Sequence, residues 1–446
     1  MKTTLRIAFS LLFCAMVFFC FSSTAFAENI DSGTWGDLTW TLDENYVLSI
    51  SGNGNMNDFE WDSSDAWAYH SENITSVIIE NGVTSIGEFA FQNCTKMTSV
   101  IIPDTVSTIG AGSFCFCSSL ADLIIPEGVQ EIDDDAFFGC SSLTSVLIPA
   151  SVTDLGGCVF ANCTDLTSIT VDPDNPSYCD IDGILYTKDL AVLWQHPAGR
   201  GDMYRIPDSV TRILYGTFYG CRKLTSITIL EKVNSIEIST FFGCSSLISI
   251  TIPESVTSIG RSAFYYCSNL TNITIPEIVT SIGEGTFSYC SNMTSITIPK
   301  GVTSIGDAAF YGCRNLADVY YAGTEAQWQE AISIGNYNDD LLKAKIHYNY
   351  VVPDLFLPNS LTTIQEEAFA GGAFHYVQLP EGAFSIGNRA FADCPNLQFI
   401  YIPESTTAIA KDAFENVSNL TIYGIDGSFA EFFASKHENC TFEAVS

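Results

Sequence analysis

The side chains of this chain that could do chemistry are its cysteines, histidines and carboxylates. The sequence holds 16 cysteines, and ten of them recur at one spacing: Cys94, Cys117, Cys140, Cys163, Cys221, Cys244, Cys267, Cys290, Cys313 and Cys394. A thiolate can bind a metal, attack a carbonyl carbon or form a disulfide. Side chains at equivalent positions of a repeat point the same way, whereas a disulfide joins two that face each other. We therefore expect the ten cysteines to be reduced core residues.

The register of this cysteine column supports the core interpretation. It places Gly371 and Val417 where a cysteine would stand, and valine can replace a small buried group but not a thiol ligand. No CxxC pair or histidine cluster accompanies the column, so we predict no metal site and no cofactor. Four cysteines lie off the column and remain candidates for a disulfide: Cys115, Cys158, Cys179 and Cys440.

No catalytic constellation is visible in the sequence. The five histidines lack H-E-x-x-H spacing, and none falls beside a serine or cysteine nucleophile in the repeat register: His70, His196, His347, His375 and His437. There is no G-x-S-x-G motif and no phosphate-binding glycine loop. Carboxylates such as Asp104 and Glu127 recur after a proline, without the contrast in environment that an acid–base pair needs. We interpret them as a solvated edge, with a bound divalent cation as the alternative, and predict that the chain is not an enzyme.

The elements that position these residues come from a repeat of 23 residues. Pairs such as Ile252-Pro253 and Ile275-Pro276 recur in phase with the cysteines. In the unit 267–287, leucine and isoleucine have the L-x-x-L-x-L spacing of a short strand, which Pro276 ends because proline has no amide hydrogen. The second half of the unit returns apolar side chains to the same core. One turn cannot bury its own apolar face, so neighbouring turns must stack.

The unit C-x-x-L-x-x-I-x-I-P-x-x-V-x-x-I-G-x-x-A-F resembles the repeat of the BspA-type leucine-rich-repeat family of secreted and surface proteins, and the resemblance covers nearly the whole mature chain. The stretch from Ser32 to Trp40 is similar to a cap that often precedes the repeats in that family. The repeat and the resemblance predict a repeat solenoid: a β-rich leucine-rich-repeat array of 23-residue turns with a parallel β-sheet on its concave face, capped ends and two inserts. The resemblance also implies a binding role, including adhesion to host matrix proteins or other cells for some members.

The phase of the repeat divides the chain into segments. Residues 1–27 have the charged start, apolar run and Ala-Phe-Ala end of a signal peptide. The other predicted segments are an N-terminal β-rich cap at 28–73, repeat block 1 at 74–171, a β-hairpin insert at 172–205, repeat block 2 at 206–320, an insert with a short helix at 321–353, repeat block 3 at 354–425 and a C-terminal cap at 426–446.

Each insert has its own signal. Strand-like runs at 184–187 and 190–195 indicate a hairpin, and Thr324 followed by Gln327 is a capping-box signature for a helix. We favour surface decoration for both inserts over contact with a partner. The cap contains four tryptophans, for which we favour covering the open core end over stacking on sugar rings: Trp35, Trp40, Trp61 and Trp67.

Side chains alternate along a strand, so residues two and four before the proline should point away from the core. These positions hold Ile101, Ile124 and Leu147 near the N-terminus and mostly serine and threonine in the middle of the array. Our candidate ligand-binding residues on this concave face are Ser226, Thr228, Ser249, Thr251, Asn272, Thr274, Ser295, Thr297, Tyr320, Tyr376 and Tyr401. Such a face suits protein backbones or glycans, but strands also accept serine and threonine without a ligand, and both interpretations stay open.

The net charge of −33, from 51 acidic and 18 basic residues, argues against nucleic acid and anionic membranes as partners. No second apolar run reaches the roughly 20 residues of a membrane span, so we predict no membrane insertion after signal removal. We predict a secreted, extracellular leucine-rich-repeat binding protein, an adhesin or host and cell-surface interaction module, with surface association left open. Its partner would be an extracellular protein or glycan. The alternative is a structural or scaffolding extracellular protein without a specific host ligand.

Overall fold

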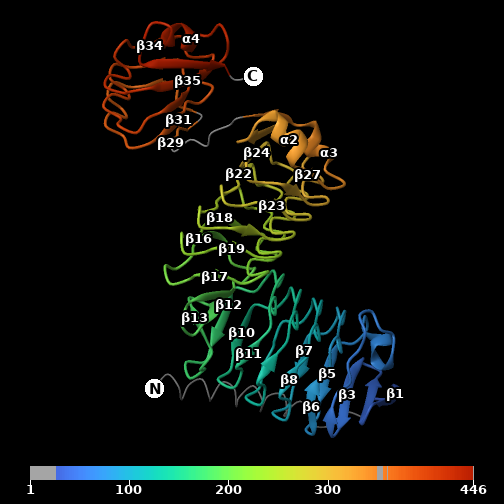
Figure 1. Cartoon of the computed structure of the whole chain (residues 1–446). Helices are drawn as coiled ribbons and strands as arrows, with labels where there is room; N and C mark the ends of the chain where they lie inside the picture. The colour runs from blue at the N-terminus through green and yellow to red at the C-terminus, as the bar shows by residue number, and fades with distance from the viewer. Residues whose placement is uncertain (1–26, 349–354, 359, 445–446) are drawn as a thin grey trace. The chain divides into compact units, whose positions relative to one another are not determined.

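The computed structural model describes residues 27–348, 355–358 and 360–444 (Figure 1), so the predicted signal peptide lies outside the described residues except for its last position. The chain is a parallel-strand β-solenoid with turns of about 23 residues, as the repeat predicts. Its turns group into two compact units. Of the described residues, those up to Leu270, Gly283–Ser291 and Ala308–Gly312 belong to the first unit, and Thr271–Ile282, Asn292–Asp307 and those from Cys313 onward belong to the second.

The first unit begins with the β-rich cap that the sequence predicts. Three antiparallel strands open it, followed by a two-residue strand and a 3-10 helix: β1 (Asn29–Trp35), β2 (Leu38–Asp43), β3 (Val47–Gly52), β4 (Gly54–Asn55) and η1 (Ala66–His70). Strand β3 then pairs in parallel with the first repeat strand, β5. The cap therefore continues the sheet of the repeats.

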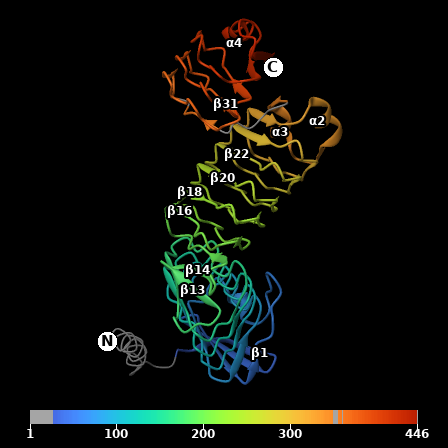
Figure 2. The ribbon, with the colours of Figure 1, turned by 60° about the vertical axis from the view of Figure 1, so that its left-hand side comes forward.

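Most turns of the first unit contribute one strand to each of two walls; the turn that carries Ile124 has no strand before its proline, only an isolated bridge between Ser99 and Asp122. The long-strand wall precedes the proline and contains β5 (Ser76–Ile79), β7 (Ser99–Ile101), β10 (Ser145–Ile148), β12 (Ser168–Val171), β16 (Asp202–Arg205), β18 (Leu224–Thr228) and β20 (Ser249–Thr251). The short-strand wall follows the proline and contains β6 (Val83–Ile86), β8 (Thr108–Ile109), β9 (Glu131–Ile132), β11 (Asp154–Leu155), β17 (Arg212–Ile213), β19 (Ser235–Ile236) and β21 (Ser258–Ile259). Figure 2 shows β16, β18 and β20 following one another. The repeat pattern predicts strands only in the long-strand wall, and most strands of the other wall are two residues long.

The second unit repeats both walls. Its long strands are β22 (Asn272–Thr274), β24 (Ser295–Ile298), β26 (Asp318–Tyr321) and β28 (Lys345–His347), then β29 (Leu355–Phe356), β31 (Tyr376–Gln378), β33 (Phe399–Tyr401), β35 (Leu420–Gly424) and β36 (Cys440–Ala444). Its short strands are β23 (Ser281–Ile282), β25 (Ser304–Ile305), β27 (Ser333–Ile334), β30 (Thr363–Ile364), β32 (Ser385–Ile386) and β34 (Ala408–Ile409).

Three short helices complete the second unit: α2 (Glu325–Ala331), α3 (Asp339–Lys343) and α4 (Phe429–Ala434). The capping box that predicts α2 is confirmed, because the Thr324 hydroxyl accepts from the amide of Gln327 and the Gln327 side chain accepts from the amide of Thr324. Helix α4 adds Ala430 and Phe433 to the core, and β36 pairs in parallel with β35. These elements form the predicted C-terminal closure.

The core is a stack of equivalent side chains. Phe91, Phe114, Phe137 and Phe160 lie ring on ring, with centroids 5.1 to 5.6 Å apart. The same ladder continues from Phe218 and recurs in the second unit. Each ring is covered by its neighbours in the adjacent turns, which is how a turn too thin to bury its own face keeps its apolar groups from water.

The cysteine column lies beside this ladder. Most of its thiols donate to the main-chain carbonyl of the phenylalanine one turn earlier, with Sγ–O distances of 3.1 Å from Cys267 to Phe241 and 3.2 Å from Cys290 to Phe264. Burial raises the pKa of the Cys163 thiol to about 12. All fourteen cysteines that the structure describes are free, including the four candidates for a disulfide. The core interpretation is confirmed.

One assignment in the column is wrong by one residue. Gly371 has a positive φ of 72°, like Gly243, which precedes a cysteine, and Cys394 donates to the carbonyl of Phe369, 25 residues back. The turn is therefore one residue shorter than its neighbours, and Gly372 occupies the cysteine position. Gly371 lies 23 residues before Cys394, but this turn has only 22 residues, so the cysteine position falls on Gly372.

The hairpin insert is confirmed in part. Antiparallel pairing joins β13 (Tyr178–Ile181), β14 (Ile184–Thr187) and β15 (Val192–Gln195), and β13 was not predicted. However, β15 pairs in parallel with β17, and β16 pairs in parallel with β18. Strands β15 and β16 thus belong to the two walls, and the projecting part of the insert is smaller than 172–205.

At this insert a histidine takes the place of a phenylalanine in the ladder. His196 packs against Phe218 at 5.2 Å between ring centroids, and its Nδ1 lies 3.6 Å from the Sγ of Cys221. His196 thus lies beside a cysteine outside the regular repeat register, because the insert shifts the phase of the turn that carries it. Burial, with a smaller contribution from Arg200, lowers the pKa of His196 to about 4, and burial raises the pKa of Cys221 well above its usual value. Both pKa shifts favour the neutral forms of the two groups.

Thiol alkylation tests the cysteine column. In the folded protein at pH 8, iodoacetamide should modify the peptides carrying half-buried Cys179 and Cys440 first, whereas column cysteines should react only after unfolding, because no reagent reaches them. Mass spectrometry of the peptides before and after denaturation measures this. Recovery of column cysteines as disulfides, or their fast alkylation in the folded state, would contradict the assignment.

The buried imidazole predicts a pH dependence. The pKa of His196 is about 4 when folded and 6.5 by its ordinary value, so between these pH values the unfolded chain takes up a proton that the folded chain does not. Stability is thus lost as the pH falls below 6.5. Between pH 7.5 and 5, urea unfolding should show the wild type losing about 2 kcal/mol relative to His196→Phe.

A neutral member of the same ladder supplies the control for this pH series. Phe241→Leu changes packing without changing a titrating group, so its difference from the wild type should be the same at both pH values. If the His196→Phe difference were equally independent of pH, the imidazole would not be held neutral by the fold.

Candidate functional site

The outer face of the long-strand wall is the predicted binding surface. Within each unit, the register between neighbouring long strands places serine and threonine side chains in rows. In the first unit, Ser226 lies beside Ser249 and Thr228 lies beside Thr251. The residue between two such side chains points inward, and Ile250 is buried. The predicted alternation is therefore present, and the rows repeat in the second unit.

The candidate residues differ in how far they reach solvent. Thr228, Ser249, Thr251 and Asn272 are exposed, and the half-buried candidates are Ser226, Thr274, Ser295, Tyr320 and Tyr401. The other two are covered, with exposed fractions of 9% for Thr297 and 4% for Tyr376. Large neighbours explain this: Thr297 is paired in register with Tyr320, and the ring of Tyr376 packs edge-on against Tyr423.

An apolar row on the same face was not among the candidate residues. Ile101, Ile124 and Leu147 are 48%, 66% and 52% exposed, at the position two residues before the proline in consecutive turns. We call these three side chains the apolar row. Threonine takes this position in later turns, as Thr228 and Thr251 show. The contrast between isoleucine and threonine at one outward position is the sequence signal that identifies the row.

The tryptophans of the cap mostly serve the core. Trp67 is fully buried, stacks on Phe91 at 6.0 Å and donates its indole N–H to the carbonyl of Ala90 at 2.7 Å. Trp40 is buried and Trp35 stacks on a neighbouring phenylalanine. Trp61 alone of the four is exposed. Three of the four tryptophans therefore cover the end of the core, which is the role that the sequence favours.

The acidic residues lie at the surface. Asp104, Glu127, Glu254 and Glu277, which follow the prolines, are exposed. Across the described residues, no group of three or more histidine, cysteine or acidic side chains could hold a metal ion. Within the same residues, no helix is long and apolar enough to cross a membrane.

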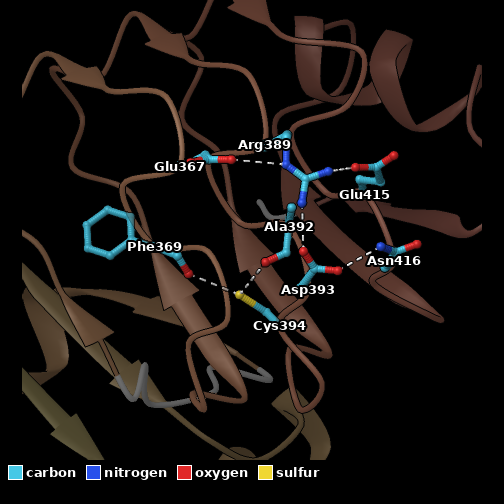
Figure 3. A network of polar contacts seen from close by, with 8 residues as sticks. All are labelled: Glu367, Phe369, Arg389, Ala392, Asp393, Cys394, Glu415 and Asn416. Atoms are coloured by element: carbon cyan, nitrogen blue, oxygen red, sulfur yellow. Dashed lines mark hydrogen bonds and ion pairs between the residues drawn. The ribbon is translucent and has the colours of Figure 1, made fainter.

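Where carboxylates cluster in the second unit, an arginine joins them (Figure 3). Arg389 pairs with Glu367 at 3.3 Å, with Asp393 at 2.7 Å and with Glu415 from the next turn. Asn416 donates to the other oxygen of Asp393 at 2.7 Å. One cation thus links acids on three successive turns, and its exposure of about a third makes this a surface network of modest strength.

Comparison with known proteins identifies the repeat. The model of the BspA type leucine rich repeat region matches six copies over residues 63–178, 203–331 and 342–446. A leucine-rich repeat protein from Eubacterium ventriosum is 25% identical with a TM-score of 0.56, and the match covers 82% of this chain and 95% of that one. A leucine rich cell surface protein from Faecalibacterium prausnitzii is 28% identical with a TM-score of 0.49, covering 68% and 98%. No curated protein matches the chain.

The family match spans well over half of the chain, and the two walls, the stacked rings and the 23-residue turns are its structural counterpart. A repeat array of this family supports a role as a protein-interaction module. The chain belongs to the BspA type leucine rich repeat family.

Proposed function

We propose that the protein is a secreted adhesin, which binds a protein on a host or another cell through the outer face of the long-strand wall. The observation that carries this proposal is the apolar row of Ile101, Ile124 and Leu147. Three half-exposed aliphatic side chains in consecutive turns form an apolar patch that folding does not require. Such patches on soluble proteins mark contact surfaces.

The energetics of the row suit a protein partner. Fully burying an isoleucine or leucine is worth about 1.5 to 3 kcal/mol, and these side chains are about half exposed, so each has roughly 1 kcal/mol left to gain. Serine, threonine and asparagine elsewhere on this wall add hydrogen-bonding groups without charge. Apolar side chains accompanied by neutral polar ones resemble the core and rim of a protein–protein interface.

A signal-peptide pattern supports the extracellular setting. Residues 1–27 have the pattern of a signal peptide, and the family is typically one of surface proteins. The net charge of −33 keeps anionic membranes and nucleic acids away, while the wall itself offers few charges. A neutral partner surface is therefore the best match, and binding should depend little on salt.

The role of the apolar row in binding can be tested with residues that other turns of the repeat carry at the same position. In the double variant Ile124→Thr and Leu147→Thr, threonine replaces the aliphatic residues at the position where it stands naturally as Thr228 and Thr251. The fold should therefore be kept, with a thermal midpoint within about 3 °C of the wild type. Retention of extracellular matrix proteins or of cells on the immobilised protein should fall at least tenfold.

The control is Ile278→Thr, which makes the same change at an exposed isoleucine outside the wall. It should bind as the wild type does. Equal binding by the double variant and the wild type would reject this face. Light scattering shows whether the wild type self-associates. If the double variant lost only that self-association, and not the retention of proteins or cells, a scaffolding role would be the better assignment than an adhesin.

A further inference from the structure

A second surface lies in the turns between the phenylalanine ladder and the cysteines of the first unit. The residue before each cysteine of the column has a positive φ, and four such residues follow one another here: 58° at Asn162, 73° at Gly220, 72° at Gly243 and 59° at Tyr266. Along this column, Gly220 and Gly243 of two neighbouring turns therefore lie between Asn162 and Tyr266, which carry side chains. We call the resulting depression, about 390 Å³ in volume, the glycine groove.

Aromatic rings and polar side chains line the glycine groove. Tyr219 and Phe242 lie parallel with centroids 4.4 Å apart, and Tyr266 meets Phe242 edge-on at 6.3 Å. Tyr266 is 45% exposed. The polar side chains of the lining are those of Asn162, Arg222, Ser245 and Ser268. At about 4.8 Å for each turn, the span from Asn162 to Tyr266 is roughly 14 Å, which is room for a short stretch of sugar chain.

The floor of the groove has no main-chain group to offer a ligand. The amides of Gly220 and Gly243 donate to the carbonyls of Phe242 and Tyr265, at 2.8 and 2.7 Å. Their carbonyls accept from the amides of the second residue after each, at 2.7 and 2.8 Å. An extended peptide that binds by adding a strand needs such groups unpaired. Recognition must therefore come from the side chains, which offer rings, hydroxyls, an amide and a guanidinium.

The charge in the groove is positive although the chain is strongly acidic. Arg205, Arg212 and Arg261 of the first unit pair with carboxylates. Arg222 is exposed in the groove lining, and none of the ion pairs found among the described residues involves it. A guanidinium kept without a carboxylate, in a protein of net charge −33, is available to an anionic ligand.

We propose that the glycine groove binds an acidic glycan. The carboxylate of a sugar acid pairs with Arg222, sugar hydroxyls bond to Asn162 and the two serines, and the apolar face of a sugar ring packs against Tyr266. This inference goes beyond the proposed function, because the groove and the apolar row share no residue. An acidic peptide is the competing ligand, and it has the weaker case because the floor offers no main-chain pairing.

The repeat itself supplies a variant that blocks the groove and keeps the fold. In Gly243→Asn the new side chain adopts the positive φ that Asn162 already has in the same column, and its Cβ would have no neighbour closer than 3.7 Å. The matched control is Gly371→Asn, at the same column position in the second unit with no atom within 4 Å of the added Cβ. Arg222→Gln removes the charge without filling the groove.

The test is calorimetric titration of the full protein with oligogalacturonate, with its methyl ester, in which the carboxylates are neutral, and with sialyllactose. Oligogalacturonate or sialyllactose should bind the wild type, Gly371→Asn and the apolar-row double variant equally. Gly243→Asn and Arg222→Gln should weaken that binding at least tenfold, and the methyl ester should bind the wild type at least tenfold more weakly than oligogalacturonate. Thermal midpoints confirm folding; if Gly243→Asn unfolds, Arg222→Gln and the ester carry the test.

Several results would overturn the proposal. No saturable binding of either acidic sugar, or binding that neither groove variant weakens, rejects the site. Binding of a glutamate-rich peptide that Gly243→Asn abolishes, without sugar binding, assigns the groove to acidic peptides instead. Failure of the groove leaves the adhesin proposal standing, because the double variant of the apolar row tests that separately.

Discussion

No turn of this chain can bury its own apolar face, and every other feature depends on that constraint. The phenylalanine ladder satisfies it by placing each ring between two others, and the cysteine column ties neighbouring turns with thiol donors to the phenylalanine carbonyls. The two ends need residues that are not repeats. Trp67 covers Phe91 at one end, and Phe433 of α4 covers Phe414 at the other. Removing a cap would expose a ring that no neighbouring turn can cover.

The same constraint leaves other columns free to vary. The residue before the cysteine keeps a positive φ whether it is Asn162, Gly243 or Tyr266, so its side chain can change without changing the turn. The outward position of the long strands likewise carries Ile124 in one turn and Thr251 in another. Both candidate surfaces, the apolar row and the glycine groove, are such variations on a constant core. The fold supplies the spacing, and the variable columns supply the chemistry.

Much of the fold could be predicted from the sequence because its core repeats in phase. The long strands, the caps, the hairpin and the helix begun by Thr324 all follow from local pattern. Prediction failed where phase was lost: His196 entered the ladder through an insert, and a 22-residue turn moved the cysteine position to Gly372. The covering of Thr297 by a large neighbour depends on the next turn and cannot be seen within one. The glycine groove could not be predicted because residues of several neighbouring turns form it and no strand or helix pattern marks them.

The cysteine column has a consequence for the conditions under which the protein can fold. The column consists of thiols, not disulfides, and they are buried against carbonyl oxygens such as that of Phe241. Assembly of the solenoid therefore needs neither an oxidant nor a disulfide isomerase, and a reductant finds no bond to cleave among the described residues. The described fold is thus complete with every one of its cysteines reduced.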